Sequence, residues 1–182
     1  MDNDASLSGT ITGDDYVAAQ RLHLRAWRKR QRASLTSFAV LGISIMALGP
    51  FMLGAILFGA GAGGFLAEML LYRRNAPRAW RKLFAQQKSL HEPFFYTWDD
   101  AGLHVSTPLA QAVRPWSHFT KRLEDRDALL LYHSDTVFEL IPKRWFEGAR
   151  VPPSLEALLN RHLGPHPGTH PAAPIATEKA LP

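Results

Sequence analysis

Three histidines near the C-terminus are the first candidates for chemistry, because their spacing suggests a metal site. His162, His166 and His170 are four residues apart, which on a helix would place three imidazole ligands on one face. Pro165 and Pro167 interrupt this stretch, and proline does not fit inside a helix. The histidines are therefore not expected to converge, and no metal site is predicted.

The other candidate catalytic groups have simpler structural explanations. Two pairs of aspartates, at positions 99 and 100 and at 125 and 127, lie in predicted turns, where aspartate bonds to nearby backbone. Ser117 and His118 are adjacent, so on a strand their side chains would point to opposite faces. The chain has no cysteine, which excludes thiol catalysis and disulfides. We expect no cofactor and no enzymatic activity, with a membrane-interface enzyme or an oligomeric transport component as alternatives.

A glycine-rich run in the middle of the chain matches the dinucleotide-binding pattern G-x-G-x-x-G at Gly59, Gly61 and Gly64. That pattern requires a preceding strand and an acidic residue about 20 positions on, where this chain has Ala-Trp-Arg. Nucleotide binding is therefore rejected. Gly59 with Gly63, and Ala60 with Gly64, instead form small-xxx-small pairs that let helices approach closely in lipid. They are predicted to pack helices, either within the chain or between two copies of a homo-oligomer.

These glycines lie in a 40-residue stretch, 33–72, that carries one formal charge, Glu68. A single helix of that length would reach about 60 Å, roughly twice the hydrocarbon core of a bilayer. Gly49-Pro50 is the natural break, and it leaves two segments of spanning length, 33–49 and 51–72. The sequence predicts a transmembrane helical hairpin. The alternative, a buried soluble hairpin, would require a polar face that these segments lack.

Basic residues crowd both ends of this stretch, and none lies between its two segments. Excess Lys and Arg stay on the cytoplasmic side of a membrane, so both termini are predicted to be cytoplasmic. Basic side chains at this level also attract anionic lipid head groups. The expected contacts are Arg28, Lys29, Arg30, Arg32, Arg73, Arg74 and Arg78. The lipid bilayer is thus an expected partner, and nucleic acid is not.

Residues 1–32 are predicted to form an N-terminal cytoplasmic segment. Residues 1–11 are small and polar, which is typical of disorder. Thr12 followed by Asp15 resembles a helix cap, and a basic helix is predicted from about residue 14 to 32. This helix would either lie on the membrane surface or be solvated. Residues 73–91 are predicted to be a basic linker or helix that leaves the membrane.

From residue 92 the sequence becomes aromatic and alternates with period two. Six short strands are predicted in about 50 residues, with turns at 99–102 and 133–135. Pro152 lies near the start of a last predicted helix, whose leucines should cap the sheet. Residues 92–163 are predicted to form a cytoplasmic β domain, and the proline-rich residues 164–182 a disordered tail. The predicted fold is an α+β membrane protein: a transmembrane hairpin followed by a small antiparallel β domain with a C-terminal helix.

Two groups of side chains in this domain are candidate binding residues. The aromatic residues Trp98, Trp116, Trp145 and Phe146 are expected in the β core and at its junction with the last helix. The sharper hypothesis makes them a groove for an extended peptide of a cytoplasmic partner protein. Lys143 and Arg144 are candidate contacts for lipid head groups, with a solvated basic face as the alternative.

Several short motifs resemble the bacterial YcxB-like membrane proteins. They are Asp15-Tyr16 before an arginine-rich stretch with Leu22-His23, the Asp-x-x-Gly turn at 99–102, Trp116 after a short strand, and a hairpin closing on Ile141-Pro142-Lys143-Arg144-Trp145-Phe146. This resemblance spans about residues 14–146, although Trp145 stands where the family is expected to have a smaller residue. It implies a two-helix anchor in the bacterial inner membrane and a cytoplasmic β domain similar to the pleckstrin-homology fold. The family has no assigned catalytic residues, so none is transferred.

These observations together predict a multi-pass inner-membrane protein. Its cytoplasmic β domain is expected to bind a partner protein or anionic lipid head groups, in a scaffolding or regulatory role.

Overall fold

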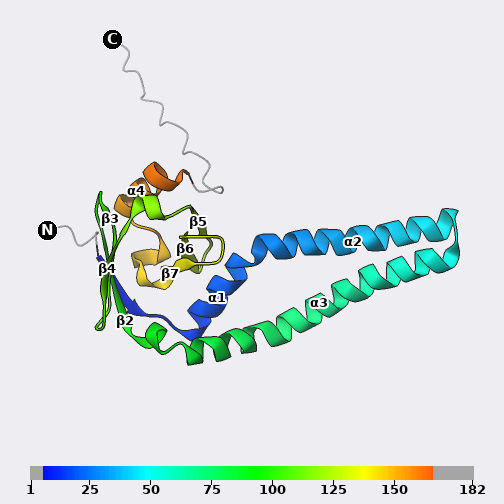
Figure 1. Cartoon of the computed structure of the whole chain (residues 1–182), viewed down its shortest axis with the longest axis horizontal. Coiled ribbons are helices and arrows are strands. Elements are labelled where there is room, and N and C mark those ends of the chain that lie inside the picture. Colours follow the sequence, from blue (N-terminus) through cyan, green and yellow to red (C-terminus); the bar gives the residue numbers. More distant parts are fainter. Residues whose placement is uncertain (1–5, 166–182) are drawn as a thin grey trace, which may run out of the picture.

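A two-helix rod extends from one side of a β domain in the computed structural model of this chain (Figure 1). The structure describes residues 6–165, so the tail predicted at the C-terminus lies almost wholly outside the described residues. The described part is α+β with antiparallel sheets, as the sequence predicts.

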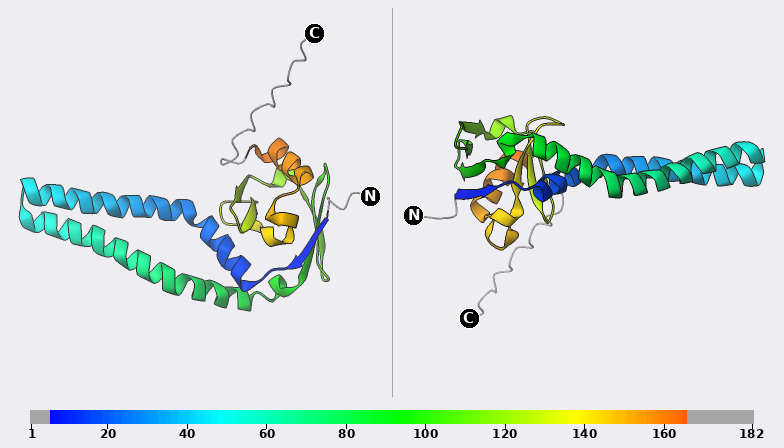
Figure 2. Two further views of the ribbon diagram at one scale, coloured as in Figure 1. Left: turned by 180° about the vertical axis from the view of Figure 1, so that it is seen from behind. Right: turned by 90° about the horizontal axis from the view of Figure 1, so that it is seen from below.

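The rod consists of α2, Arg25–Leu48, and α3, Phe51–Gln86. Its tip falls at Gly49 and Pro50, as predicted: Gly49 is extended and Pro50, with φ −67°, stands directly before the first residue of α3. Figure 2 shows from two further sides that the two helices run side by side and point away from the β domain.

The second helix continues well beyond the predicted span. It passes through Pro77 and ends at Gln86, and a short 3₁₀-helix, η2, Lys88–His91, follows. Proline removes one backbone donor from the helix, yet Tyr72 and Trp80 pack edge-to-face across this turn, with ring centroids 5.5 Å apart. The basic segment after the apolar stretch is therefore mostly helix, continuous with the rod.

Two antiparallel sheets form the β domain. The first has the order β1-β2-β3-β4 and the second the order β5-β6-β7. Their bounds are Ser6–Thr10, Pro93–Trp98, Gly102–Ser106, Gln111–Pro115, Lys121–Glu124, Ala128–Tyr132 and Phe138–Pro142. Three 3₁₀-helices, η3 (Trp116–His118), η4 (Lys143–Trp145) and η5 (Glu147–Ala149), and the helix α4, Pro153–Leu163, complete it.

The prediction of disorder before residue 12 is wrong for residues 6–10, which form β1. This strand pairs antiparallel with β2, from Ser6 opposite Thr97 to Thr10 opposite Pro93. The composition of β1 gives little sign of a strand, because Leu7 is its one large apolar residue and the one that faces the core. The rod is thus inserted between the first two strands of one sheet.

The helix predicted from residue 14 to 32 divides at Leu24 into α1, Gly13–His23, and α2. Thr12 and Asp15 form the predicted capping box. Val17, Ala19 and Leu22 of α1 are buried, and Ala19 and Leu22 pack in one core cluster with residues of β6 and β7. The expectation that this part of the helix is solvated or lies on a membrane is therefore wrong, because its apolar face covers the second sheet.

The helix α4 closes the domain from the other side. Leu155, Leu158 and Leu159 are buried against Trp98, Trp116 and the core side chains of β6, as the helical spacing of these leucines predicts. The second sheet lies between α1 and α4. Its strands β6 and β7 contribute side chains to both core clusters, and Leu123 of β5 packs against the cluster on the α1 side.

Candidate functional site

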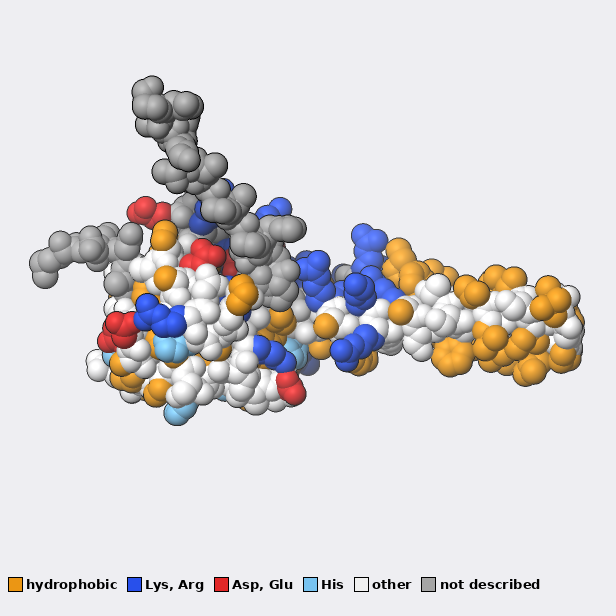
Figure 3. Space-filling model, turned by 90° about the horizontal axis from the view of Figure 1, so that it is seen from above, with side chains coloured by type: hydrophobic (Ala, Val, Ile, Leu, Met, Phe, Trp, Pro, Cys, Tyr) orange, Lys and Arg blue, Asp and Glu red, His pale blue; other side chains and the backbone are white. Residues whose placement is uncertain are grey.

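The outer part of the rod is apolar and exposed. In the most apolar 18-residue window of each helix, only 6% of α2 and 11% of α3 is buried inside the structure, whereas a core helix of a soluble domain is mostly buried. Figure 3 shows hydrophobic side chains over the outer half of the rod and Lys and Arg side chains where it meets the β domain. By length and composition, both helices can cross a membrane.

Glycines form the seam between the two helices. A Cβ on Gly42 would overlap the backbone of Phe58, and one on Gly61 would lie within 3 Å of the Ala39 backbone. Such close helix approach depends on the absence of a side chain. Gly64 also faces α2, where its Cβ would meet Leu35.

The other glycines of the predicted packing set face outward. A Cβ on Gly59 or Gly63 would meet nothing within 4 Å, and Ala60 is exposed. The structure therefore separates the run into Gly61 and Gly64, which pack within the chain, and Gly59 and Gly63, which leave an open face.

Polar contacts join the two helices at the domain end of the apolar stretch. Arg32 Nε donates to Glu68 Oε2 at 3.0 Å, and the Arg28 guanidinium lies 4.1 Å from the centre of the Tyr72 ring. The Glu68 side chain is only 10% exposed, and its negative charge is paired with Arg32 within the hairpin. Arg28 and Arg32 are consequently engaged inside the rod, rather than free for lipid.

The remaining basic residues at this level are exposed and surround the rod. We call them the basic collar: Arg25, Lys29, Arg30, Arg73, Arg74 and Arg78. Within residues 6–165, none of them makes an ion pair with a carboxylate. The collar thus presents uncompensated positive charge beside the apolar surface.

Lys143 and Arg144 do not belong to such a surface. Lys143 Nζ donates to Glu124 Oε1 at 2.6 Å and is mostly buried. Arg144 donates to both carboxylate oxygens of Asp15 and to the Thr10 carbonyl, at 2.7 Å to the latter. These two residues tie the end of the second sheet to α1 and β1, which leaves them poorly placed as lipid contacts.

The Asp15 carboxylate shows the effect of this contact. Burial by itself raises its pKa, but hydrogen bonds from Arg144 and Thr12 outweigh that effect and hold the pKa of Asp15 below its usual value. The same pairing raises the pKa of Arg144. Asp15 is therefore ionised at neutral pH, and its role is structural.

A second polar contact joins α1 to the sheet. His23 Nδ1 and the Tyr132 hydroxyl are 2.9 Å apart, and the two rings stack. Burial raises the pKa of Tyr132 to about 12, while burial and then the charge of Lys121 lower the pKa of His23. Both groups are therefore uncharged at neutral pH, and a neutral hydrogen bond joins α1 to β6.

The four aromatic candidates divide into two pairs. Trp98 and Trp116 are core residues, whose indole N–H groups donate to Ser154 Oγ at 3.2 Å and to the Asp99 carbonyl at 2.8 Å. Trp145 and Phe146 border a groove of about 750 Å³. The core interpretation holds for the first pair and for Phe146, which is buried in the same core cluster, whereas Trp145 is partly buried beside the hollow.

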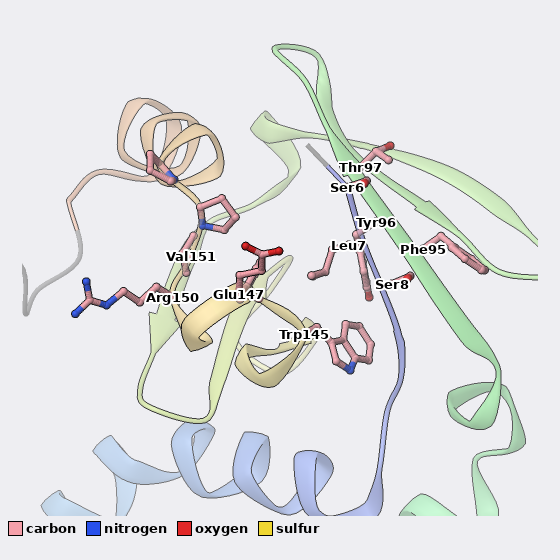
Figure 4. Close-up of a pocket in the computed structure, with 13 residues that line it drawn as sticks. Ser6, Leu7, Ser8, Phe95, Tyr96, Thr97, Trp145, Glu147, Arg150 and Val151 are labelled. Carbon is pink, nitrogen blue, oxygen red and sulfur yellow. The ribbon is translucent and has the colours of Figure 1, made fainter. Parts of the chain in front are cut away.

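The groove runs along the outer edge of β1 (Figure 4). On one side are residues 6–8 and 95–97 of the first sheet; on the other is the segment from η5 to the start of α4, with Glu147, Arg150 and Val151. The sequence hypothesis places a groove at the four aromatic residues, of which only Trp145 and Phe146 line this one. It does not include β1, because Leu7 and Gly9 alone are a weak signal for a strand.

The remaining chemical candidates keep their simpler explanations. The carboxylate of Asp99 accepts from the N–H groups of Ala101 and Gly102, and that of Asp125 from the two N–H groups that follow its turn. His162 stacks on Trp116, and the other two C-terminal histidines lie outside the described residues. No cluster of three potential metal ligands occurs among residues 6–165.

The part of the chain with short strands, a turn and a closing hairpin is the part that matches a known family. Residues 98–152 match the family model of the YcxB-like proteins. This match confirms the resemblance for the motifs from the turn at 99–102 to Phe146, while those at 15–16 and 22–23 lie outside the matched residues. The YcxB-like segment runs from the end of β2 through β7 to η5, and it includes Trp98, Trp116, Trp145 and Phe146 but not β1, α1 or the rod. No curated protein and no solved structure matches the chain.

Proposed function

We propose that this chain is an integral protein of the bacterial inner membrane, with two spans and both termini in the cytoplasm. The observation that carries the proposal is the pattern of charge along the rod. Its exposed apolar helices have the basic collar at the domain end and no charge at the tip. The positive-inside rule then assigns the β domain to the cytoplasm.

The role that the geometry supports best is that of a membrane-anchored binding module without catalytic chemistry. The collar is suited to anionic lipid head groups, since each exposed Lys or Arg near the surface contributes about 1 kcal/mol. The β domain, with two antiparallel sheets and a closing C-terminal helix, supports a pleckstrin-homology-like fold. Its candidate surface for an extended peptide, including one from a partner protein, is the groove beside β1.

Reporter fusions test this topology directly. An enzyme that is active only outside the cytoplasm should be inactive when fused after residue 165, and active when inserted between Gly49 and Pro50. A cytoplasm-dependent fluorescent reporter should show the opposite pattern. Activity of the first reporter at the C-terminal fusion would overturn the two-span arrangement.

A further inference from the structure

The groove beside β1 contains an unsatisfied strand edge. In an antiparallel pair, the residues that exchange both backbone hydrogen bonds alternate along each strand. Asp99 N–H donates to the Gly102 carbonyl at 3.2 Å, which places the backbone groups of Thr97 and Phe95 toward β3. Tyr96 and Phe94 therefore face β1, and their partners there are Leu7 and Gly9.

It follows that the N–H and C=O groups of Ser6, Ser8 and Thr10 point away from the sheet. The Arg144 guanidinium confirms this direction independently, since it donates to the Thr10 carbonyl from outside the sheet. Within the described chain, the outward backbone groups of Ser6 and Ser8 have no hydrogen-bond partner. An open edge beside a hollow is the arrangement that accepts an added strand.

We propose that this edge binds an extended peptide strand, and that its occupant is the chain's own C-terminal segment, residues 175–181. Extended backbone is the one chemistry that pairs with alternating N–H and C=O groups along a strand edge. Its side chains would enter the hollow lined by Leu7, Trp145 and Val151. The proposal depends neither on the membrane topology nor on lipid binding.

The sequence after residue 165 singles out this segment. Proline cannot donate to a strand edge, and Ile175–Leu181 is the longest proline-free run there, with Ile175 and Leu181 as its large apolar residues. Its charges, Glu178 and Lys179, balance each other, as Glu147 and Arg150 do on the rim of the groove.

The chain is also long enough to reach. Pro153, the first residue of α4, borders the groove, and the 11 residues of α4 carry the chain about 16 Å away from it. The ten residues from Pro165 to Ile175 span up to roughly 33 Å when extended. The segment can therefore return to β1 without moving the β domain.

Binding of a labelled synthetic peptide tests the proposal. The peptide of residues 170–182 is titrated, with fluorescence anisotropy as the readout, against the full chain and against a chain that ends at residue 165, both in lipid nanodiscs. The shortened chain should bind it, and the full chain should bind at least about tenfold more weakly, because the tethered segment competes at high effective concentration. No binding to the shortened chain would overturn the proposal.

A matched pair of variants locates the binding edge. Ser8→Pro in the shortened chain removes one outward N–H and leaves the β1–β2 ladder intact, so peptide binding should be lost. Ser8→Ala keeps that N–H and should bind as the parent does. Unchanged binding by Ser8→Pro would show that the peptide lies elsewhere.

Amide hydrogen exchange gives a result even if Ser8→Pro does not fold. The Ser8 N–H should exchange at least about tenfold more slowly in the full chain than in the shortened chain, while the Leu7 N–H, which already bonds to β2, changes little. Equal Ser8 exchange in the two chains would contradict the proposal. A concentration-dependent protection of Ser8 in the shortened chain would also contradict it, because a second copy would then be the occupant.

Discussion

At the scale of single residues, Arg144 connects three separate parts of the sequence. It joins η4 to Asp15 of α1 and to the Thr10 carbonyl of β1. Since the Asp15 side chain is only 10% exposed, removing its partner leaves a poorly solvated carboxylate. Arg144→Ala should therefore lower the free energy of unfolding of the β domain by about 1–3 kcal/mol.

The control for this prediction is Arg161→Ala. Arg161 also pairs with an aspartate, at 2.8 Å, but both side chains are exposed, at 62% and 86%. Exposed pairs contribute about 0–1 kcal/mol, so this variant should unfold almost as the parent does. Chemical denaturation followed by tryptophan fluorescence measures the free energy of unfolding of both variants. Equal losses of stability in the two would contradict the structural role of Arg144.

His23 should make the stability of the domain depend on pH. Its folded-state pKa lies below the value of about 6.5 expected in the unfolded chain, chiefly because of burial. The folded state then binds fewer protons, so this contribution is fully present above pH 6.5 and is lost as the pH falls below it.

Denaturation of the parent and of His23→Gln at pH 7.5, 6.5 and 5.5 tests this expectation. The parent should lose more stability over this range than the variant, which has no titrating group at position 23. Equal pH dependence of the two would show that His23 is readily protonated in the folded state.

At the scale of elements, the α2–α3 seam distinguishes glycines that look alike in sequence. Gly61→Leu should force the two helices apart, because its side chain would overlap the Ala39 backbone. Gly63→Leu meets open space and should leave the hairpin intact. Cysteines introduced at positions 32 and 68, whose native side chains are in contact, can be joined by a short thiol-reactive crosslinker. This crosslinking reports on the seam and should be lost only with Gly61→Leu.

The outward glycines provide a separate test of self-association. If Gly59 and Gly63 form an oligomer seam, changing both to Ile should reduce crosslinking between copies in membranes, since large side chains prevent close helix contact. Unchanged crosslinking would remove this face as an interface. The cysteine pair described above serves as a control that the hairpin is still formed.

At the scale of the whole molecule, the proposed membrane arrangement makes α3 the element that separates the β domain from the bilayer. Its 36 residues span about 54 Å, against a hydrocarbon core of about 30 Å. The helix after residue 72 therefore acts as a stalk, with the basic collar at its base. This arrangement favours lipid contact by the collar rather than by the β domain.

The triple variant Arg73→Gln, Arg74→Gln, Arg78→Gln tests the collar. At about 1 kcal/mol per residue, it should weaken retention of phosphatidylglycerol by up to the order of a hundredfold. Native mass spectrometry of the purified protein measures bound lipid. The matched control removes three exposed arginines of the β domain, Arg126, Arg150 and Arg161, and should retain lipid normally. Equal loss in both variants would point to net charge instead of the collar.

The sequence by itself determined the features that depend on local patterns. The apolar length, the Gly49-Pro50 break, the Thr12 cap, the strands from β2 to β7 and the leucine face of α4 all follow from periodicity and from backbone preferences of nearby residues.

Only the tertiary structure decided the features that depend on residues far apart in the chain. β1 is a strand because β2, more than 80 residues later, supplies its partner, and five mostly polar residues carry little signal alone. The division of α1 from α2, the engagement of Arg144 and the inward or outward direction of each glycine likewise depend on what packs against them. The groove has the same origin: its lining comes from residues 6–8, 95–97 and 145–153, and no local pattern contains all three segments.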